Sequence, residues 1–299
     1  YVLDLGRKKY VEVPNAKWID TVSWSNNAFA YQAEKGYAYF DVATGETKTF
    51  GGTTDTFPPI ISSDGSYIAY ANNGLAVFSI KTSKAIVLTQ NIHDIPLLWK
   101  ADDKTLVIST TATVSTSSDG EMAKNKLAEF HIGTRAMRDI VALPQPVKQA
   151  KWVAKNALAL ISLGADDGTF DYGLDFSNGN LSLIAETSEG IAFTGSRDGK
   201  IATLKGARLT LYGAHLEKIS DLKRTSKGNI ANFFLLPPTR ALLFIEKDKG
   251  YDIATFDMET SVETVIKNIW LPYAVLSPTG KNAVTVNAGN DNVDFFDIQ

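Results

Sequence analysis

The stretch Pro58–Leu88, PPIISSDGSYIAYANNGLAVFSIKTSKAIVL, contains four short apolar or alternating segments separated by turn residues. The segments with strand character are Pro58–Ser62, Tyr67–Ala71, Leu75–Ile80 and Ala85–Leu88. The turns between them are Ser63-Asp64-Gly65-Ser66, Asn72-Asn73-Gly74 and Lys81-Thr82-Ser83-Lys84. Turn residues of these types supply unusual backbone angles or local hydrogen bonds, and the segments between them suit a pleated surface. The stretch therefore predicts a four-stranded sheet, which needs neighbouring sheets to bury both of its faces.

Similar units recur along the whole chain. The first hairpin turn of each unit can be aligned on the residue that precedes it, namely Trp24, Ile61, Trp99, Trp152, Thr194, Leu236 and Leu276. Successive positions are 37, 38, 53, 42, 42 and 40 residues apart. A period near 40 with four strands per unit is typical of propeller blades. Helix-period amphipathicity is not sustained, which disfavours helical repeats.

We therefore expect an all-β fold, a seven-bladed β-propeller of four-stranded antiparallel blades, forming one domain over residues 1–299. The seventh unit ends with a third strand, Val293–Ile298, and lacks a fourth. The N-terminal hairpin precedes the first blade, where a closing strand belongs. Either Tyr10–Val13 or Tyr1–Leu5 is predicted to complete the last blade by pairing the two ends of the chain.

The units resemble the TolB-like, WD40-like propeller repeat of bacterial exported proteins. Ser277-Pro278-Thr279-Gly280-Lys281 is similar to the first turn of that repeat, and Ser62-Ser63-Asp64-Gly65-Ser66 is the next closest copy. Asp41-Val42-Ala43-Thr44-Gly45-Glu46 matches its later turn. The Gly-His and Trp-Asp dipeptides of eukaryotic WD repeats are absent. The resemblance implies a propeller that binds proteins or peptides, and it implies no catalytic residues.

Composition excludes several classes of protein. The formal net charge of −3 and the scattered basic residues argue against nucleic-acid binding. The absence of cysteine excludes disulfides and thiolate metal sites. No apolar run reaches the roughly 20 residues of a membrane helix, so we expect no membrane insertion. Abundant Ser, Thr and Asn with few Met favour an exported, extracytoplasmic bacterial protein.

No motif of enzyme chemistry stands out. The three histidines, His93, His131 and His215, show no metal-ligand spacing. A Gly-x-Ser-x-Gly elbow is absent, and Gly51-Gly52 is followed by no helix that would receive a phosphate. We therefore predict no cofactor and no catalytic residue.

Two insertions, Thr111–Lys126 and Gly164–Asp171, fall between the second and third strands of neighbouring blades. Loops at that point emerge on the face that carries the blade-to-blade connections, so both insertions are expected on one face. Asp166, Asp167 and Asp171 are candidate oxygen ligands for calcium, and the alternative is a solvated acidic turn. The Ser/Thr-rich insertion is predicted to be a mobile surface loop.

The central channel and the tryptophans provide further candidates. The innermost strands begin near Asp20, Asp55, Asp94, Lys148, Glu189, Asn232 and Tyr273. The acidic members would attract a cation or a basic peptide, or they are ordinary polar lining around water. The tryptophans Trp24, Trp99 and Trp152 are predicted inter-blade core, whereas Trp18 and Trp270 are either contact anchors or packing.

We predict a non-catalytic binding or scaffold module that recognises a protein or peptide partner on the face bearing residues 111–126 and 164–171. The candidate partner-binding residues are Trp18, His93, Asp94, Asp166, Asp167, Asp171, Glu189 and Trp270. The alternative is a propeller enzyme of the lactonase, lyase or glycosidase type, with a divalent cation in the central channel. That alternative requires several carboxylates and amides converging on one ion.

Overall fold

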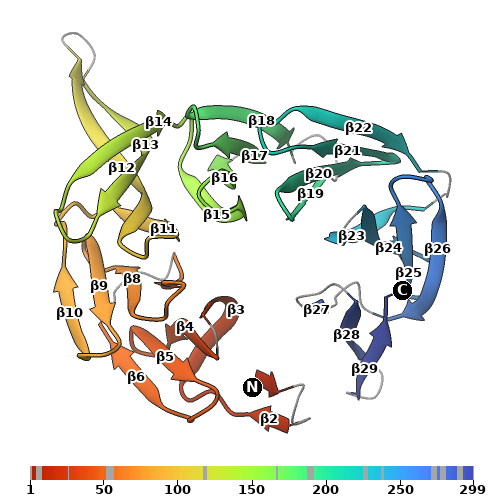
Figure 1. Cartoon of the computed structure of the whole chain (residues 1–299), viewed down its shortest axis with the longest axis horizontal. Helices are drawn as coiled ribbons and strands as arrows, with labels where there is room; N and C mark the ends of the chain where they lie inside the picture. The colour runs from red at the N-terminus through yellow and green to blue at the C-terminus, as the bar shows by residue number, and fades with distance from the viewer. Residues whose placement is uncertain are drawn as a thin grey trace. The chain divides into compact units, whose positions relative to one another are not determined.

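The computed structural model describes residues 2–4, 9–25, 27–51, 57–116, 120–165, 168–186, 192–224, 228–236, 239–270, 275–276, 281–287 and 292–298. Every regular element in these ranges is a β-strand, and all the pairings are antiparallel (Figure 1). Among the same residues, no helix has the length and apolar character needed to cross a membrane. The chain divides into two compact units, Tyr1–Pro146 and Val147–Gln299.

The first unit contains an N-terminal hairpin and three four-stranded sheets. The hairpin consists of β1 (Val2–Asp4) and β2 (Lys9–Val11). Sheet 1 consists of β3 (Ala16–Ser25), β4 (Ala28–Ala33), β5 (Tyr37–Asp41) and β6 (Thr47–Phe50). Sheet 2 consists of β7 (Ile60–Ile61), β8 (Tyr67–Ala71), β9 (Leu75–Ser79) and β10 (Lys84–Val87). Sheet 3 consists of β11 (Ile95–Trp99), β12 (Thr105–Thr116), β13 (Gly120–His131) and β14 (Met137–Ala142).

The second unit contains three four-stranded sheets and one of three strands. Sheet 4 consists of β15 (Val147–Ala154), β16 (Leu158–Ala165), β17 (Gly168–Asp175) and β18 (Asn180–Glu186). Sheet 5 consists of β19 (Ala192–Arg197), β20 (Lys200–Lys205), β21 (Arg208–Tyr212) and β22 (Lys218–Lys223). Sheet 6 consists of β23 (Ile230–Leu236), β24 (Arg240–Glu246), β25 (Tyr251–Asp257) and β26 (Glu263–Ile269). Sheet 7 consists of β27 (Val275–Leu276), β28 (Asn282–Asn287) and β29 (Asn292–Asp297).

Each four-stranded sheet pairs its strands in chain order, as a simple meander. This confirms the all-β fold of four-stranded antiparallel sheets and the four strands predicted in Pro58–Leu88. Sheet 7 has three strands among the described residues, and β1 pairs with β2. The seven-bladed count and the closing strand pairing remain predictions.

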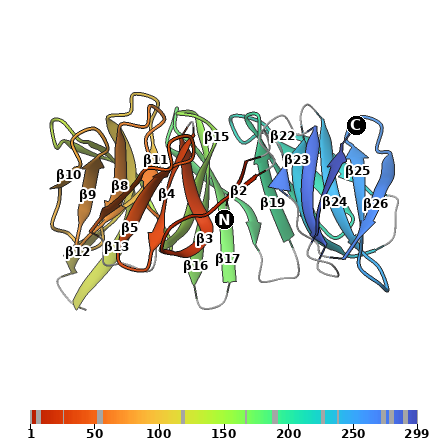
Figure 2. The same ribbon diagram turned by 90° about the horizontal axis from the view of Figure 1, so that it is seen from below.

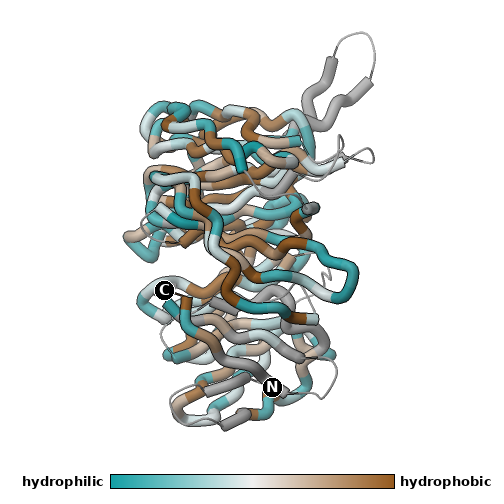
Figure 3. Tube along the Cα trace, turned by 90° about the vertical axis from the view of Figure 1, so that its right-hand side faces the viewer, coloured by the Kyte–Doolittle hydropathy of each residue, from teal (hydrophilic) through white to brown (hydrophobic). Residues whose placement is uncertain are grey.

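The middle strands of the sheets are buried on both faces. In β8 and β9, four of the five residues are buried, whereas every residue of the outer strand β10 is exposed. A strand that is covered on both sides needs a continuous apolar run instead of an alternating one. Figure 3 shows hydrophobic residues in the strand interiors and hydrophilic residues at the turns.

Hydrogen bonds between neighbouring sheets join positions about one repeat apart. The Ser25 hydroxyl donates to the Ser63 carbonyl at 2.9 Å, and the Ser63 N–H donates to the Asp103 carboxylate at 2.7 Å. The Trp99 indole N–H donates to the Ile60 carbonyl at 3.0 Å. The first-hairpin turns aligned from the sequence are therefore neighbours in sheets 1, 2 and 3, which confirms their equivalence.

The predicted tryptophan core is correct only in part. Trp99 is buried and Trp152 is half-buried, but Trp24 is 50% exposed. Trp24 lies at the end of β3, where its ring packs on Phe29 with ring centroids 4.6 Å apart. The prediction is wrong for Trp24. A residue that precedes the first hairpin turn of its repeat is buried only where another part of the protein packs against its side chain.

The Thr111–Lys126 insertion is not the mobile loop that we predicted. Residues 111–116 and 120–126 extend β12 and β13 as paired strands, with register pairs from Thr111 and Asn125 to Thr116 and Gly120. Figures 1 and 2 show this paired arm projecting beyond the rest of sheet 3. Three threonines and Val114 lie within residues 111–116, and such β-branched residues favour strands, which explains the difference. The two insertions lie in different units, so their common face remains a prediction.

Gly74 is required by the turn between β8 and β9. Its φ angle is +134°, and a Cβ atom there would lie 2.3 Å from the Thr89 carbonyl oxygen. We predict that Gly74→Ala lowers the free energy of unfolding by about 2–4 kcal/mol, because backbone strain and a backbone clash add. The matched control is Gly45→Ala, since Gly45 has φ +75° but open space around its Cβ position. The control should lose about 1 kcal/mol in urea unfolding, and equal losses for both variants would contradict this account.

Candidate functional site

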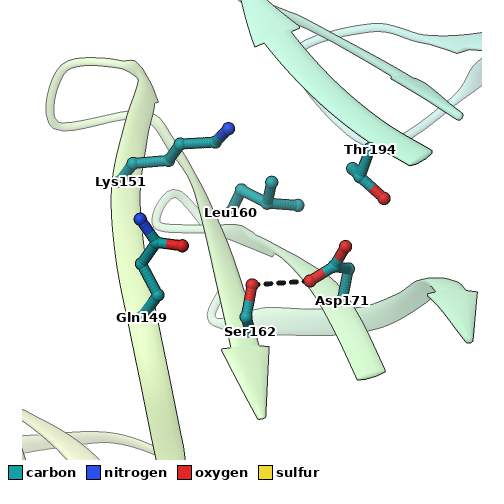
Figure 4. Close-up of a pocket in the computed structure, with 6 residues that line it drawn as sticks. All are labelled: Gln149, Lys151, Leu160, Ser162, Asp171 and Thr194. Carbon is teal, nitrogen blue, oxygen red and sulfur yellow. Dashed lines mark hydrogen bonds between the residues drawn. The ribbon is translucent and has the colours of Figure 1, made fainter. Parts of the chain in front are cut away.

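A polar hollow of about 120 Å³ lies between sheets 4 and 5 (Figure 4). The residues that line it are Gln149, Lys151, Leu160, Ser162, Asp171 and Thr194. Five come from β15, β16 and β17 of sheet 4, and Thr194 comes from β19 of sheet 5. Interfaces between packed sheets are normally apolar, so a polar hollow at this place is unusual.

Strand register explains why these side chains meet. Gln149 is the register partner of Ser162, which in turn pairs with Asp171 on the next strand. Lys151 is likewise opposite Leu160. Residues directly opposite on neighbouring strands share a face, and so do residues two apart along one strand. The lining residues of sheet 4 therefore form two adjacent cross-strand rows on one face.

The Asp171 carboxylate is buried and held in place by a neighbour. The Ser162 hydroxyl donates a hydrogen bond to Asp171 Oδ1 at 2.5 Å. Charge-assisted bonds of this length are among the stronger hydrogen bonds in proteins. Asp171 is thus a fixed negative charge at the wall of the hollow.

Lys151 brings an amine into the same hollow. Its side chain is partly exposed to solvent. The protein atoms around it nevertheless hinder solvation of its ammonium group. This desolvation lowers the pKa of Lys151, and the nearby negative charge of Asp171 offsets part of the decrease. A larger share of Lys151 is therefore a neutral amine near neutral pH than for an ordinary surface lysine.

Thr194 completes the hollow from the facing sheet. Its hydroxyl oxygen is buried and has no hydrogen-bond partner among the described residues. An unsatisfied buried hydroxyl costs free energy, which a bound polar ligand would recover. The hollow therefore combines an amine, a carboxylate, a primary amide and an unpaired hydroxyl.

Only one residue of this site, Asp171, was predicted from the sequence. Asp171 was predicted as a calcium ligand in a loop with Asp166 and Asp167, but it lies within β17, bonded to Ser162. Asp166, Asp167 and Glu189 lie outside the described residues. Gln149, Lys151, Ser162 and Thr194 were missed, although three polar residues in the inner strand VKQAKWV, residues 147–153, were a usable signal.

The remaining predicted residues lie elsewhere. Asp94 is buried and accepts hydrogen bonds from Asn91 and Thr110, so its carboxylate stabilises the turn before β11. His93 beside it is exposed. Trp270 is 62% exposed just after β26. Trp18 belongs to β3, and its side chain is not among the described parts.

A divalent cation is not supported by the described residues. They contain no group of three His, Cys, Asp or Glu side chains placed to hold a metal. The hollow offers one carboxylate next to a lysine, whose ammonium form repels cations. Divalent ions such as calcium are usually held by several carboxylate and carbonyl oxygens. This donor set does not fit a metal.

Comparisons with protein families and with curated proteins found no relative of this chain. No family model matches the chain, and no curated protein matches it either. The TolB-like resemblance therefore rests on sequence pattern alone.

Several solved structures are similar to the chain. An oligogalacturonate lyase in complex with manganese aligns with a TM-score of 0.53 and 14% identity over 87% of this chain and 81% of that chain. The β-propeller domain of the Trilobed protease from Pyrococcus furiosus aligns with a TM-score of 0.53 and 12% identity over 94% and 93%. Dipeptidyl peptidase 4 from Porphyromonas gingivalis aligns with a TM-score of 0.61 and 10% identity over 93% and 48%.

These similarities correct the predicted function. The similar structures include lyases and peptidases, so the prediction of a non-catalytic binding or scaffold module does not stand. At sequence identities of 10–14%, similarity to a solved structure establishes only the fold. The chain spans about half the length of the peptidase chains and more than four-fifths of the lyase chains. The described chain therefore has a β-propeller fold shared with enzymes of two kinds.

Proposed function

We propose that this protein is a propeller enzyme of the lyase type that acts on a sugar chain bearing carboxylate groups. The observation that carries the proposal is the Lys151 amine, whose pKa is lowered in a polar hollow. Support also comes from two oligogalacturonate lyases, of which the chain covers 81% and 84%, the second from Vibrio parahaemolyticus. An extracytoplasmic location, which the composition favours, is part of the proposal.

The residues of the hollow suit a β-elimination. The neutral Lys151 amine takes the proton from the carbon next to the substrate carboxylate. The electron pair released forms a carbon–carbon double bond while the bond to the leaving sugar oxygen breaks. The ammonium that results then returns its proton to the departing oxygen. Gln149 and Thr194 supply donors for the negative charge that develops on the substrate carboxylate.

Two other reaction types fit the hollow less well. A glycosidase normally needs two carboxyl groups on opposite sides of the scissile bond, and the described lining holds one, Asp171. A serine hydrolase needs a histidine between its serine and its acid, whereas Ser162 donates directly to Asp171. The similar lyase was solved with manganese, but the donor set described above does not fit a metal, and no step depends on one.

A substrate comparison tests the proposal. Purified protein is incubated with oligogalacturonate, and the ultraviolet absorbance of the unsaturated product is followed. The matched control is the methyl-esterified oligomer, in which the recognised carboxylate is neutral. We expect turnover of the acidic oligomer and little turnover of the ester. No absorbance change with the acidic oligomer at any pH up to the Lys151 titration would reject the lyase assignment.

We also propose that sheet 7 is the seventh blade and that the N-terminal hairpin completes it. The support is that sheets 1–6 have four strands each, whereas sheet 7 has three among the described residues. Closure predicts slow exchange with solvent deuterium for those amides of β29 that point away from its partner β28, because a second paired strand would protect them. In a chain without residues 1–11 they should exchange quickly. Rapid exchange of β29 in the intact chain would contradict closure.

A further inference from the structure

Sheet 5 is basic although the chain as a whole is acidic. Residues 192–224, which hold its four strands, include seven lysines and arginines against three aspartates and glutamates, whereas the whole chain has a formal net charge of −3. One of the seven, Arg224, is buried in its ion pair with Glu263 and adds no charge to the surface. The positive charge that remains on sheet 5 favours a negatively charged partner.

Strand register gathers three of these cations into one row, the basic row Lys205, Arg208 and Lys223. Lys205 on β20 is directly opposite Arg208 on β21, which is directly opposite Lys223 on β22. Such positions share a face of the sheet, with Cβ atoms about 5 Å apart. All three residues are exposed. The Asp221 carboxylate lies 3.5 Å from Arg208 Nε and 2.7 Å from the Lys218 ammonium, so this one shared carboxylate does not neutralise the row.

The fold itself does not require basic residues at these positions. Like charges directly opposite one another destabilise a sheet. In sheet 6 the row at the same place, beside the turn between the second and third strands, consists of Glu246, Tyr251 and Ile269, and it holds no cation. The unfavourable arrangement in sheet 5 is explained if a negatively charged ligand bridges the three cations.

The basic row lies on the face of sheet 5 that carries Thr194. Thr194 is the register partner of Thr203, and Lys205 lies two residues further along β20. Residues two apart on a strand share a face and are about 7 Å apart. The opposite face, with Leu204 and Leu209, packs in an apolar cluster with sheet 6. The row therefore begins one step along the sheet from the hydroxyl that closes the hollow, and it runs from β20 to β22, away from β19 (Figure 1).

We propose that the basic row Lys205, Arg208 and Lys223 is an anchoring subsite for the acidic sugar chain beside the Lys151 hollow. Because it states where the rest of the substrate binds, the inference rests on the proposed function. A chain with a carboxylate on each sugar places one of them in the hollow and leaves the others outside. The planar Arg208 guanidinium suits a carboxylate, and the flexible lysines beside it adjust to its neighbours. Long oligomers therefore bind more tightly than a single sugar.

The test measures binding without turnover. Titration calorimetry gives the Kd of galacturonate and of a long oligogalacturonate at low salt. The pH is kept below the Lys151 titration, where the ammonium form takes no proton from the substrate. The double variant Lys205→Gln, Lys223→Gln removes two charges and leaves the ion pair of Arg208. Urea unfolding should show that this variant is at least as stable as the wild type, because it relieves contacts between like charges.

The matched control is the double variant Lys81→Gln, Lys84→Gln. Both residues are exposed in sheet 2 or in its last turn, so this variant changes the net charge equally at a place remote in the fold. Its Kd for the oligomer should match that of the wild type.

We expect Lys205→Gln, Lys223→Gln to weaken binding of the long oligomer roughly 2- to 30-fold, the range for two exposed ion pairs, and to leave binding of galacturonate unchanged. The difference should shrink as added salt screens the exposed charges. An oligomer Kd equal to that of the wild type, or an equal loss in the sheet 2 control, would overturn the anchoring subsite. Row-dependent binding without any elimination product would reject the lyase chemistry alone and support the subsite.

Discussion

Replacing Arg224 by methionine is expected to lower the free energy of unfolding by about 3–5 kcal/mol. Arg224 follows β22 in sheet 5, and its Nε donates to Glu263 Oε2 of sheet 6 at 3.0 Å. The two side chains are 1% and 6% exposed. Methionine keeps most of the side-chain volume but leaves the Glu263 carboxylate buried without its counter-ion, and that uncompensated charge causes the loss.

The control is the double variant Arg224→Met, Glu263→Met. Replacing both members of a buried ion pair by apolar groups is often close to neutral, so the double variant should recover most of the stability. Urea unfolding followed by circular dichroism measures both variants. A double variant as unstable as the single one would show that the ion pair is not the source of the effect.

Replacing Lys151 by methionine is expected to reduce kcat on an acidic oligosaccharide by roughly 10²- to 10⁴-fold, the range for loss of a general base. Lys151→Arg should be equally inactive, because arginine keeps the charge but does not release its proton. Lys148→Met is the matched control, since Lys148 belongs to the same strand but covers Gly164 instead of lining the hollow.

The pH profile of the wild-type protein provides the second part of this test. The rate should rise with pH as the Lys151 ammonium becomes an amine. It should level off at a lower pH than for an ordinary lysine, because the surrounding protein atoms hinder solvation of the ammonium group and lower the pKa of Lys151. Full activity of Lys151→Arg, or a rate that falls as Lys151 deprotonates, would exclude Lys151 as the base.

The sequence alone was enough to predict the strands and the period at which they repeat. In Pro58–Leu88, turn residues such as Asn73 and Gly74 mark where each strand ends, and both adopt positive φ angles. Such local rules depend on residue type alone. The equivalence of the two turns joined by the Ser25–Ser63 hydrogen bond could be predicted for the same reason, because each turn follows the first strand of a repeat.

The candidate site could not be predicted in the same way. Gln149 faces Ser162 only because the register between β15 and β16 shifts between Val147 and Gln149. Thr194 approaches Lys151 through packing of one sheet on the next. Neither a bulge nor a sheet-to-sheet contact is encoded in local spacing. Asp171 was identified for its carboxylate, but its partner Ser162 became evident only from the strand pairing.

The function prediction failed for a related reason. Without a histidine cluster or a known motif, the sequence favoured a binding module, since the amine of Lys151 looks like any other lysine in the chain. Its altered chemistry arises from the surrounding protein, which becomes visible only once the sheets are packed.

The most direct test of the lyase assignment is the mass of the products formed from an acidic oligosaccharide. Elimination leaves one fragment with an unsaturated end, lighter by one water than the fragment that hydrolysis would give. We predict that the wild-type protein yields the lighter fragment and that Lys151→Met yields neither. Products carrying the added water, or an equal yield of the lighter fragment from Lys151→Met, would contradict the role assigned to this hollow.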